Sequence, residues 1–195
     1  MMTPDQEREC IRQARTDPRA FAPIYDHYFP RVYAYVHYRV YDRQDAEDII
    51  ADVFFKAIRN LKRFKWRNTH SFAAWLFRIA HNLVMDYCRQ RRRAGLSLEP
   101  VDNLIETVDQ TPLPEDALAQ QEAFQQMRGL IVTLSPRRQE VVTLRFYGGL
   151  RNCEIARVLG LRERTVAAHL CRALQDLERQ YPAPAKSELV TEAVT

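Results

Sequence analysis

The residues with the clearest chemical potential form a run near the middle of the chain in which cationic and aromatic side chains alternate. From residue 62 to residue 70 it reads Lys-Arg-Phe-Lys-Trp-Arg-Asn-Thr-His. Cations can hold phosphates while aromatic rings stack on unpaired bases, so this composition suits single-stranded nucleic acid. Phe64 and Trp66 could equally be core residues flanked by solvated lysines. The run alone does not decide between the two interpretations.

A second pattern lies in the last third of the chain. Residues 152–161 read Asn-Cys-Glu-Ile-Ala-Arg-Val-Leu-Gly-Leu, which predicts a short helix that ends at a glycine turn, and a longer amphipathic helix follows. Such a pair is a helix-turn-helix unit, whose second helix enters the major groove of DNA. A plain helical hairpin with a solvated polar face is the weaker alternative. The outward side of the second helix is predicted to carry Arg164, Thr165, Ala168, His169 and Arg172.

A third feature is an acidic face on a helix predicted for residues 42–61. Apolar residues at spacings of three and four define the buried side of this helix. An exposed aromatic ring among carboxylates indicates a protein-binding surface. A stray apolar residue on a solvated face is the simpler alternative. The face consists of Asp45, Asp48, Asp52, Phe55 and Arg59.

These three groups of residues must be positioned by helices, and the rest of the sequence predicts where those helices lie. Amphipathic stripes begin at Asp17-Pro18, with a kink or break at Pro30, and recur over 71–93. Residues 94–117 hold six carboxylates, three prolines and no lysine or arginine, as an extended linker would. We expect an all-α fold of two small helical domains joined by an acidic flexible linker. Its parts are an N-terminal helical bundle at 1–93, the linker at 94–117, a C-terminal helix-turn-helix domain at 118–181 and a disordered tail at 182–195.

Composition excludes several classes of protein. The net charge of +4 is weak evidence for nucleic acid by itself, and 46% hydrophobic residues are enough for a buried core. The four cysteines are scattered without a CxxC pair, so neither a metal site nor a disulfide is expected. No glycine-rich phosphate loop or nucleophile–base arrangement points to an enzyme or a cofactor. The absence of a signal peptide and of a long apolar run predicts a cytoplasmic protein with no membrane insertion.

Together these segments resemble the extracytoplasmic-function sigma factors. The stretch from Asp45 to Ala57, which begins Asp-Ala-Glu-Asp-Ile-Ile, is similar to the polymerase-binding helix of that family. The stretch from Phe72 to Tyr87 is similar to its helix for promoter melting and minus-ten reading. Residues 134–174 are similar to its minus-thirty-five-reading domain. Two independent domains in the right order make the resemblance specific.

The resemblance implies a factor that binds core RNA polymerase and directs promoter-specific transcription initiation, restrained by a cognate anti-sigma factor. The polymerase-binding residues would be Asp45, Asp48, Asp52 and Phe55. Those for minus-ten DNA and strand melting would be Lys62, Phe64, Lys65, Trp66, Arg67, Phe72, Arg78, Asn82 and Arg89. Those for minus-thirty-five DNA would be Arg151, Arg162, Arg164, Thr165, Ala168, His169 and Arg172.

The chain departs from the family pattern at three positions. Ala51 stands where glutamine is common, and Arg151 and Arg162 stand where serine is common, at the predicted starts of the two helix-turn-helix helices. A shift of one residue would let Asn152 cap the first of them instead. The alternative function is a stand-alone helix-turn-helix regulator that binds duplex DNA as a dimer. That alternative leaves the basic and aromatic run unexplained.

Overall fold

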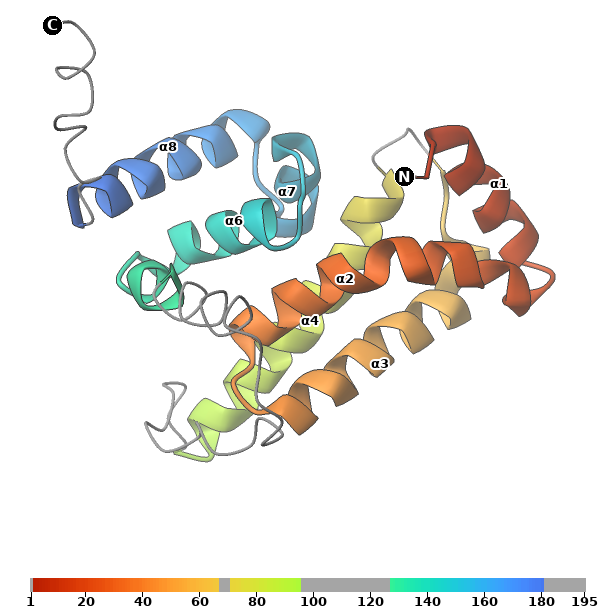
Figure 1. Cartoon of the computed structure of the whole chain (residues 1–195), viewed down its shortest axis with the longest axis horizontal. Helices are drawn as coiled ribbons and strands as arrows, with labels where there is room; N and C mark the ends of the chain where they lie inside the picture. The colour runs from red at the N-terminus through yellow and green to blue at the C-terminus, as the bar shows by residue number, and fades with distance from the viewer. Residues whose placement is uncertain (1, 67–70, 96–126, 181–195) are drawn as a thin grey trace, which may run out of the picture.

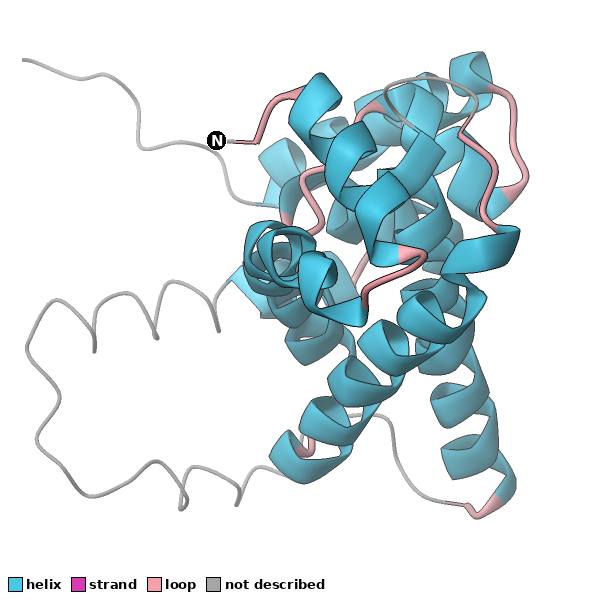
Figure 2. Ribbon diagram, turned by 90° about the vertical axis from the view of Figure 1, so that its right-hand side faces the viewer, coloured by secondary structure: helices cyan, strands magenta, loops and turns pink. Residues whose placement is uncertain are grey.

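The computed structural model describes residues 2–66, 71–95 and 127–180, and over these ranges helices and their connecting loops form the whole chain (Figures 1 and 2). This confirms the all-α prediction. The predicted linker and tail fall largely or wholly on residues outside the described ranges, and so does Arg67. The elements are α1 (Pro4–Ala14), the 3-10 turn η1 (Pro18–Phe21), α2 (Ala22–Arg39), α3 (Arg43–Asn60), the 3-10 turn η2 (Leu61–Arg63), α4 (Ser71–Arg93), α6 (Pro136–Phe146), α7 (Asn152–Leu159) and α8 (Glu163–Gln180).

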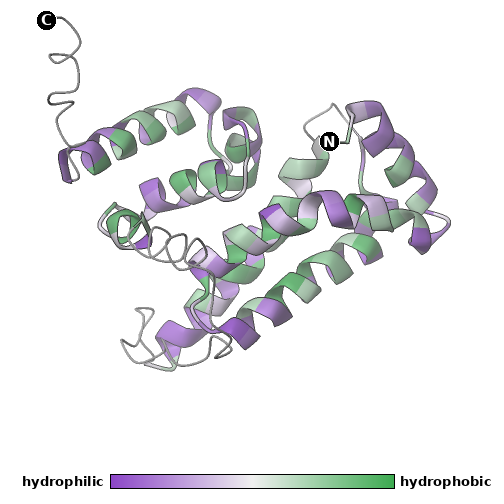
Figure 3. Ribbon diagram, in the orientation of Figure 1, coloured by the Kyte–Doolittle hydropathy of each residue, from purple (hydrophilic) through white to green (hydrophobic). Residues whose placement is uncertain are grey.

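The N-terminal bundle, which is the described part up to residue 95, is built on α2, α3 and α4. The bounds of α3 and α4 confirm the predicted helices over 42–61 and 71–93. The side chain of Asp42 caps α3 by accepting a hydrogen bond from the backbone nitrogen of Asp45 at 2.8 Å. The helix α1 was not predicted. It carries few apolar residues and is a largely hydrophilic helix (Figure 3), anchored through the buried Ile11.

Of the kink or break predicted at Pro30, the break is wrong, because α2 runs through this proline from residue 22 to residue 39, and the kink stays a prediction. Proline lacks the N–H that would bond the carbonyl four residues earlier, which here belongs to Asp26. Asp26 and Pro30 both lie on the exposed side of α2, where water can bond that carbonyl. The lost hydrogen bond therefore costs little at this position.

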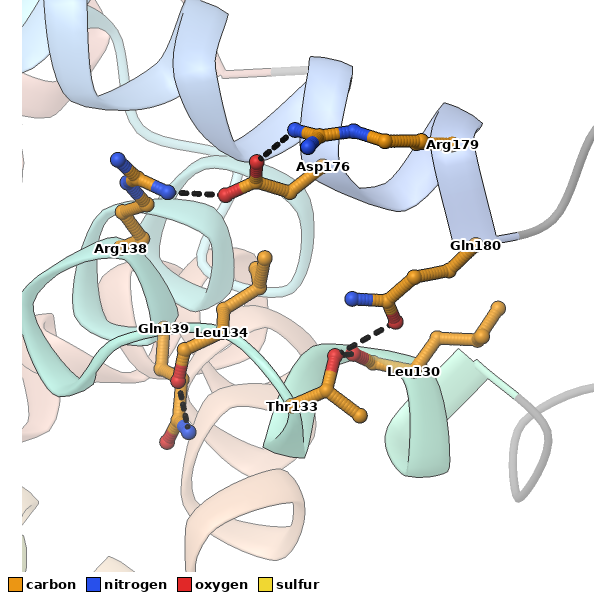
Figure 4. A network of polar contacts seen from close by, with 8 residues as sticks. All are labelled: Leu130, Thr133, Leu134, Arg138, Gln139, Asp176, Arg179 and Gln180. Atoms are coloured by element: carbon orange, nitrogen blue, oxygen red, sulfur yellow. Dashed lines mark hydrogen bonds and ion pairs between the residues drawn. The ribbon is translucent and has the colours of Figure 1, made fainter.

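The C-terminal unit, residues 127–180, contains the predicted helix-turn-helix. The helix α7 is capped at its C-terminus by Gly160, whose left-handed backbone (φ 67°, ψ 31°) suits glycine. After two intervening residues α8 begins at Glu163. Asp176 on α8 accepts hydrogen bonds from Arg138 on α6 and from Arg179, and Thr133 donates to Gln180 at 2.7 Å (Figure 4). These contacts fix the direction of α8 against α6. Leu174 is 44% exposed, whereas Val166 and Ala173 are buried, so the buried face of α8 is narrow.

The C-terminal unit packs directly on the N-terminal bundle. The helix α7 lies against α4, and buried residues of both parts belong to one continuous apolar core. Arg31 on α2 donates from Nε to the carbonyl of Gly148 at 2.9 Å and from its terminal nitrogen to that of Gly149 at 3.0 Å. A Cβ atom at Gly148 would lie 2.9 Å from the ring of Phe77, so glycine permits this approach.

A second contact joins the end of α2 to the C-terminal unit. The ring of Tyr38 stacks on that of Tyr147, with centroids 4.6 Å apart. The guanidinium of Arg128 lies 3.7 Å from the centroid of the Tyr41 ring, a cation–π distance. Tyr38 also belongs to a buried cluster whose other members come from the C-terminal unit. The described residues therefore form a closed arrangement of the two parts.

Candidate nucleic-acid interface

The outward face of α3 presents an acidic surface with one aromatic ring. Phe55 is 58% exposed, whereas its neighbour Phe54 is 4% exposed and belongs to the core. Asp48 and Asp52 are exposed on the same helix. Asp45 lies at the edge of this surface and is 3.6 Å from Arg91 in an ion pair with α4. Phe55 follows the carboxylates on this face, and the guanidinium of Arg59 lies 5.6 Å from the centroid of its ring. An exposed phenylalanine at the end of a row of carboxylates is a feature of a docking surface more than of a solvated helix.

The basic and aromatic run is divided between surface and core. Lys62 and Lys65 are exposed, and Trp66 is half-buried with its ring perpendicular to that of Phe64 at 6.3 Å. Phe64 and Phe72 are buried, and their rings pack edge to face at 5.4 Å. This corrects the expectation that these two phenylalanines offer ring faces to bases, because their faces are already covered.

An arginine that the sequence did not single out holds this segment in place. Arg15 ends α1 and donates a hydrogen bond to the carbonyl oxygen of Phe64 at 2.6 Å. The run that carries Lys65 and Trp66 is thus tied to α1 across 49 residues of sequence. The signal available in the sequence was the start of α1, where Thr3 and Gln6 form a reciprocal cap.

The face of α4 predicted to read the minus-ten element is partly engaged by the C-terminal unit. Arg78, Asn82 and Arg89 are exposed. Arg78 nevertheless donates a hydrogen bond to the carbonyl oxygen of Arg157 on α7, and Arg89 pairs with Asp86 on its own helix. In the closed arrangement Asn82 remains accessible while Arg78 is held by the neighbouring unit.

His81 on α4 lies at this junction. Burial, and then the nearby charges of Arg39 and Arg137, lower the pKa of His81 to about 4. Its Nδ1 lies 3.2 Å from the hydroxyl of Tyr35, which is itself buried. The imidazole is therefore neutral at neutral pH.

The predicted recognition helix α8 keeps its outward side open. Arg164, Ala168 and Arg172 are exposed, and Thr165 and His169 are half-buried beside them. These positions are spaced at three and four, so they share one side of the helix. Arginine and threonine on such a side can hydrogen-bond base edges in the major groove.

The two unusual arginines lie at the helix starts, as predicted. Arg151 is the N-cap of α7, so the alternative in which Asn152 supplies the cap is wrong. The carboxylate of Glu154 accepts a hydrogen bond from the backbone nitrogen of Arg151 at 2.6 Å and supports the start of α7 without a serine. The backbone carbonyl of Arg162 accepts from the nitrogens of Thr165 and Val166, and the Arg162 side chain is exposed.

The described ranges contain no group of three His, Cys, Asp or Glu side chains placed to hold a metal ion. Within the same ranges, no helix combines the length and apolar character required to cross a bilayer.

Comparison with known proteins places this arrangement in a family. The family model for sigma-70 region 2 matches residues 24–94, and that for sigma-70 region 4 matches residues 124–177. The extracytoplasmic-function RNA polymerase sigma factor BldN of Streptomyces coelicolor is 34% identical over 180 residues, which cover 91% of this chain and 67% of BldN. The sigma factor SigW of Bacillus subtilis is 28% identical over 180 residues, covering 89% of this chain and 95% of SigW.

Solved structures share the fold. CnrH in complex with the cytosolic domain of CnrY matches with a TM-score of 0.65 and 22% identity, over 91% of this chain and 98% of that one. The sigma factor RpoE in complex with the anti-sigma factor NepR from Bartonella quintana matches with a TM-score of 0.65 and 21% identity, over 84% of this chain and 97% of that one. With both sigma-70 regions in order and a relative of this similarity, the chain belongs to the extracytoplasmic-function sigma factors, which direct transcription initiation.

Proposed function

We propose that this sigma factor uses three surfaces in sequence: α3 binds core RNA polymerase, the segment after α3 together with α4 opens and reads the minus-ten element, and α8 reads the minus-thirty-five element. The domains that carry these surfaces would be residues 1–93 and 118–181, joined by the acidic linker 94–117. The observation that carries the proposal is the acidic face of α3, where Phe55 is exposed beside Asp48 and Asp52. A stand-alone regulator that dimerises would need a self-complementary face, and two copies of an acidic face repel each other.

Polymerase binding rests on Asp48, Asp52 and Phe55. Carboxylates give orientation and a fast encounter with a basic partner, and a desolvated aromatic ring gives affinity. Asp45 would act at the edge of this surface, because it is already paired with Arg91.

Strand melting rests on Trp66, Lys62 and Lys65, with Asn82 and Arg89 on α4 and Arg67 beside them in the sequence. An unpaired base would stack on Trp66 while the lysines hold phosphates. Phe64 and Phe72 would support the ring of Trp66 from below, since both are buried. Arg78 would join the DNA contacts once it is released from Arg157.

Upstream reading rests on the outward side of α8. Arg164, Thr165, Ala168 and Arg172 would contact base edges, with His169 at the flank. Arg151 and Arg162 would contact phosphates, because helix starts lie near the DNA backbone in a docked helix-turn-helix.

Regulation and setting complete the proposal. A cognate anti-sigma factor would hold the protein inactive, as NepR does in its complex with RpoE. We propose that the sigma factor described here acts in the cytoplasm, where RNA polymerase works. We assign this sigma factor no catalytic activity and no cofactor.

The test is to add the purified protein to core RNA polymerase and map transcription starts genome-wide. Distinct new starts that share upstream and minus-ten sequences are expected. Asp52→Arg should abolish them and weaken core binding, whereas Asp26→Arg, at an exposed position on α2, should not. If the Asp52→Arg protein is well folded and binds core polymerase as tightly as the parent, α3 is not the polymerase-binding surface. DNA binding by the free protein with no effect on polymerase would favour the stand-alone regulator.

A further inference from the structure

An open cleft lies between α1 and the segment from Lys62 to Trp66, with a volume of about 780 Å³. Clefts of this size hold small molecules or parts of larger ligands. The wall formed by α1 precedes residue 24, where the region 2 match begins. None of the surfaces described above includes this wall.

The charge of the cleft is strongly positive. Six cationic side chains line it against the two carboxylates of Asp5 and Glu9. Arg12 donates two hydrogen bonds of 2.8 and 2.5 Å to the carboxylate of Glu9, so the charges of these two side chains cancel. The remaining cations outnumber Asp5, and an anionic ligand is favoured because clefts lined by one sign of charge concentrate ions of the other sign.

The cations come from both walls. Arg8 projects from α1 and Lys62 and Lys65 from the opposite segment, and all three are exposed. Arg15, which also lines the cleft, joins the walls through its hydrogen bond to Phe64. This bond holds the two walls together, and cationic side chains from both walls line one space.

The chemistry of the lining also includes an aromatic surface. Trp66 is half-buried and lines the same cleft as these cations. Cations that follow a backbone, next to a ring that can stack on a base, are the features of a single-strand site. A compact anion such as free phosphate would bind the cations but would make no use of the tryptophan ring. An unpaired DNA strand would contact both the cations and the ring, so it fits the lining of the cleft better.

We propose that α1 forms the second wall of the single-strand site, and that Arg8 contacts a backbone phosphate of the melted DNA strand next to the base held at Trp66. This inference rests on the proposed function of the protein in promoter melting. It extends the DNA-binding surface to a helix outside the matched region 2, and it makes Arg8 a contact to phosphate without base preference.

The test uses holoenzyme assembled from the full chain and core polymerase. The probes are a promoter fork with a single-stranded non-template tail and the same duplex without the tail, both fluorescently labelled, titrated across a salt series. For Arg8→Ala we expect about five- to tenfold weaker binding of the tailed fork at low salt and a salt slope shallower by about 0.7, the share of one single-strand phosphate. Binding of the trimmed duplex should be unchanged. Arg19→Ala, an exposed arginine on η1 outside the cleft, is the matched control.

The outcomes separate the possibilities. Unchanged affinity and slope for the tailed fork in Arg8→Ala would overturn the inference while leaving the sigma activity of the parent intact. Weaker binding of Arg8→Ala to core polymerase, with unchanged affinity for the tailed fork once core is supplied in saturating amount, would also overturn it, since the cleft would then hold an acidic segment of the polymerase. Failure of the parent protein itself to form a holoenzyme that starts transcription would instead count against the proposed function.

Discussion

The guanidinium of Arg78 on α4 donates a hydrogen bond to the carbonyl oxygen of Arg157 on α7. One of the residues proposed to contact minus-ten DNA is thus held by the helix-turn-helix unit. The outward side of α8 is open in the same arrangement. The closed chain therefore leaves its upstream-reading helix available while part of its melting helix is engaged.

Arg31→Ala should loosen this closed arrangement. The side chain bonds the carbonyl of Gly148 in a part-buried position and that of Gly149 in an exposed one, and the loss of the part-buried hydrogen bond costs about 1 kcal/mol. We expect a larger radius of gyration for the free protein by small-angle X-ray scattering, with helix content unchanged. Arg19→Ala serves as the control at an exposed site. An unaltered scattering profile would show that the apolar contact alone holds the parts together.

Adjacent phenylalanines on α3 should give opposite results. Phe54→Ala removes a buried ring and should lower the free energy of unfolding by about 3–5 kcal/mol. Phe55→Ala removes an exposed ring and should leave the melting temperature nearly unchanged while weakening core polymerase binding by about tenfold or more. Calorimetry and a polymerase-binding titration on both variants would check this. Full polymerase affinity in Phe55→Ala would make that ring a solvated surface residue.

Trp66→Ala should impair promoter opening after a normal closed complex has formed. Each stacked base contributes about 1–3 kcal/mol, so open complexes should fall by about tenfold or more. Permanganate reactivity of unpaired thymines measures this directly. Trp66→Phe keeps a ring and should retain most of the opening. Normal reactivity in the alanine variant would assign Trp66 to the core beside Phe64.

Arg162→Ser should stabilise the protein and weaken its DNA binding. A serine at the start of α8 can accept a backbone hydrogen bond that arginine cannot, which contributes about 1 kcal/mol, and the change removes a cation from the positive end of the helix. Loss of one phosphate contact should make the salt dependence of promoter binding shallower by about 0.9. Thermal melts and binding titrations across salt would test both parts. An identical salt slope would mean that Arg162 makes no phosphate contact.

Stability should fall as pH decreases from about 6.5 towards 4, and His81 should account for part of the fall. Burial lowers the pKa of His81 to about 4 in the folded protein, so below the ordinary value of about 6.5 the unfolded chain takes up a proton that the folded chain does not. Glu7 acts in the opposite sense, because burial raises its pKa. The difference between the parent and His81→Gln in denaturant melts from pH 7 to pH 4.5 isolates the histidine. Parallel curves would refute the assignment.

Much of the bundle could be predicted because the apolar residues of its helices recur at spacings of three and four. The apolar spacing over 42–61 gave α3, and the Gly160 turn gave the division between α7 and α8. The helix α1 was missed because most of its residues face water and only a few, such as Ile11, reach the core. The rule that proline breaks a helix did not predict α2 correctly. The hydrogen bond that Pro30 cannot donate lies on the solvent side of α2, where water can replace it.

The residue types of the candidate site could be predicted from the sequence, but which of these side chains are exposed could not. Lys62, Phe64 and Trp66 stand within five residues of each other, and nothing in that spacing says that the middle ring is buried. Packing against Phe72 decides it, and that contact depends on the fold. The contact of Arg78 with Arg157 lies further from prediction, since it joins residues 79 apart through a backbone carbonyl that has no sequence signature.

The core shared by the two parts also bears on how long the protein lasts. Separation of the parts uncovers apolar surface, including that of Tyr38 and Phe77, which are now covered by Tyr147 and Gly148. Uncovered apolar surface favours aggregation and attack by proteases. A separated chain would therefore be more open to aggregation and proteolysis than the closed chain, unless a partner covered the uncovered surface. The supply of usable factor in a cell would then depend on its rate of destruction as well as its rate of synthesis.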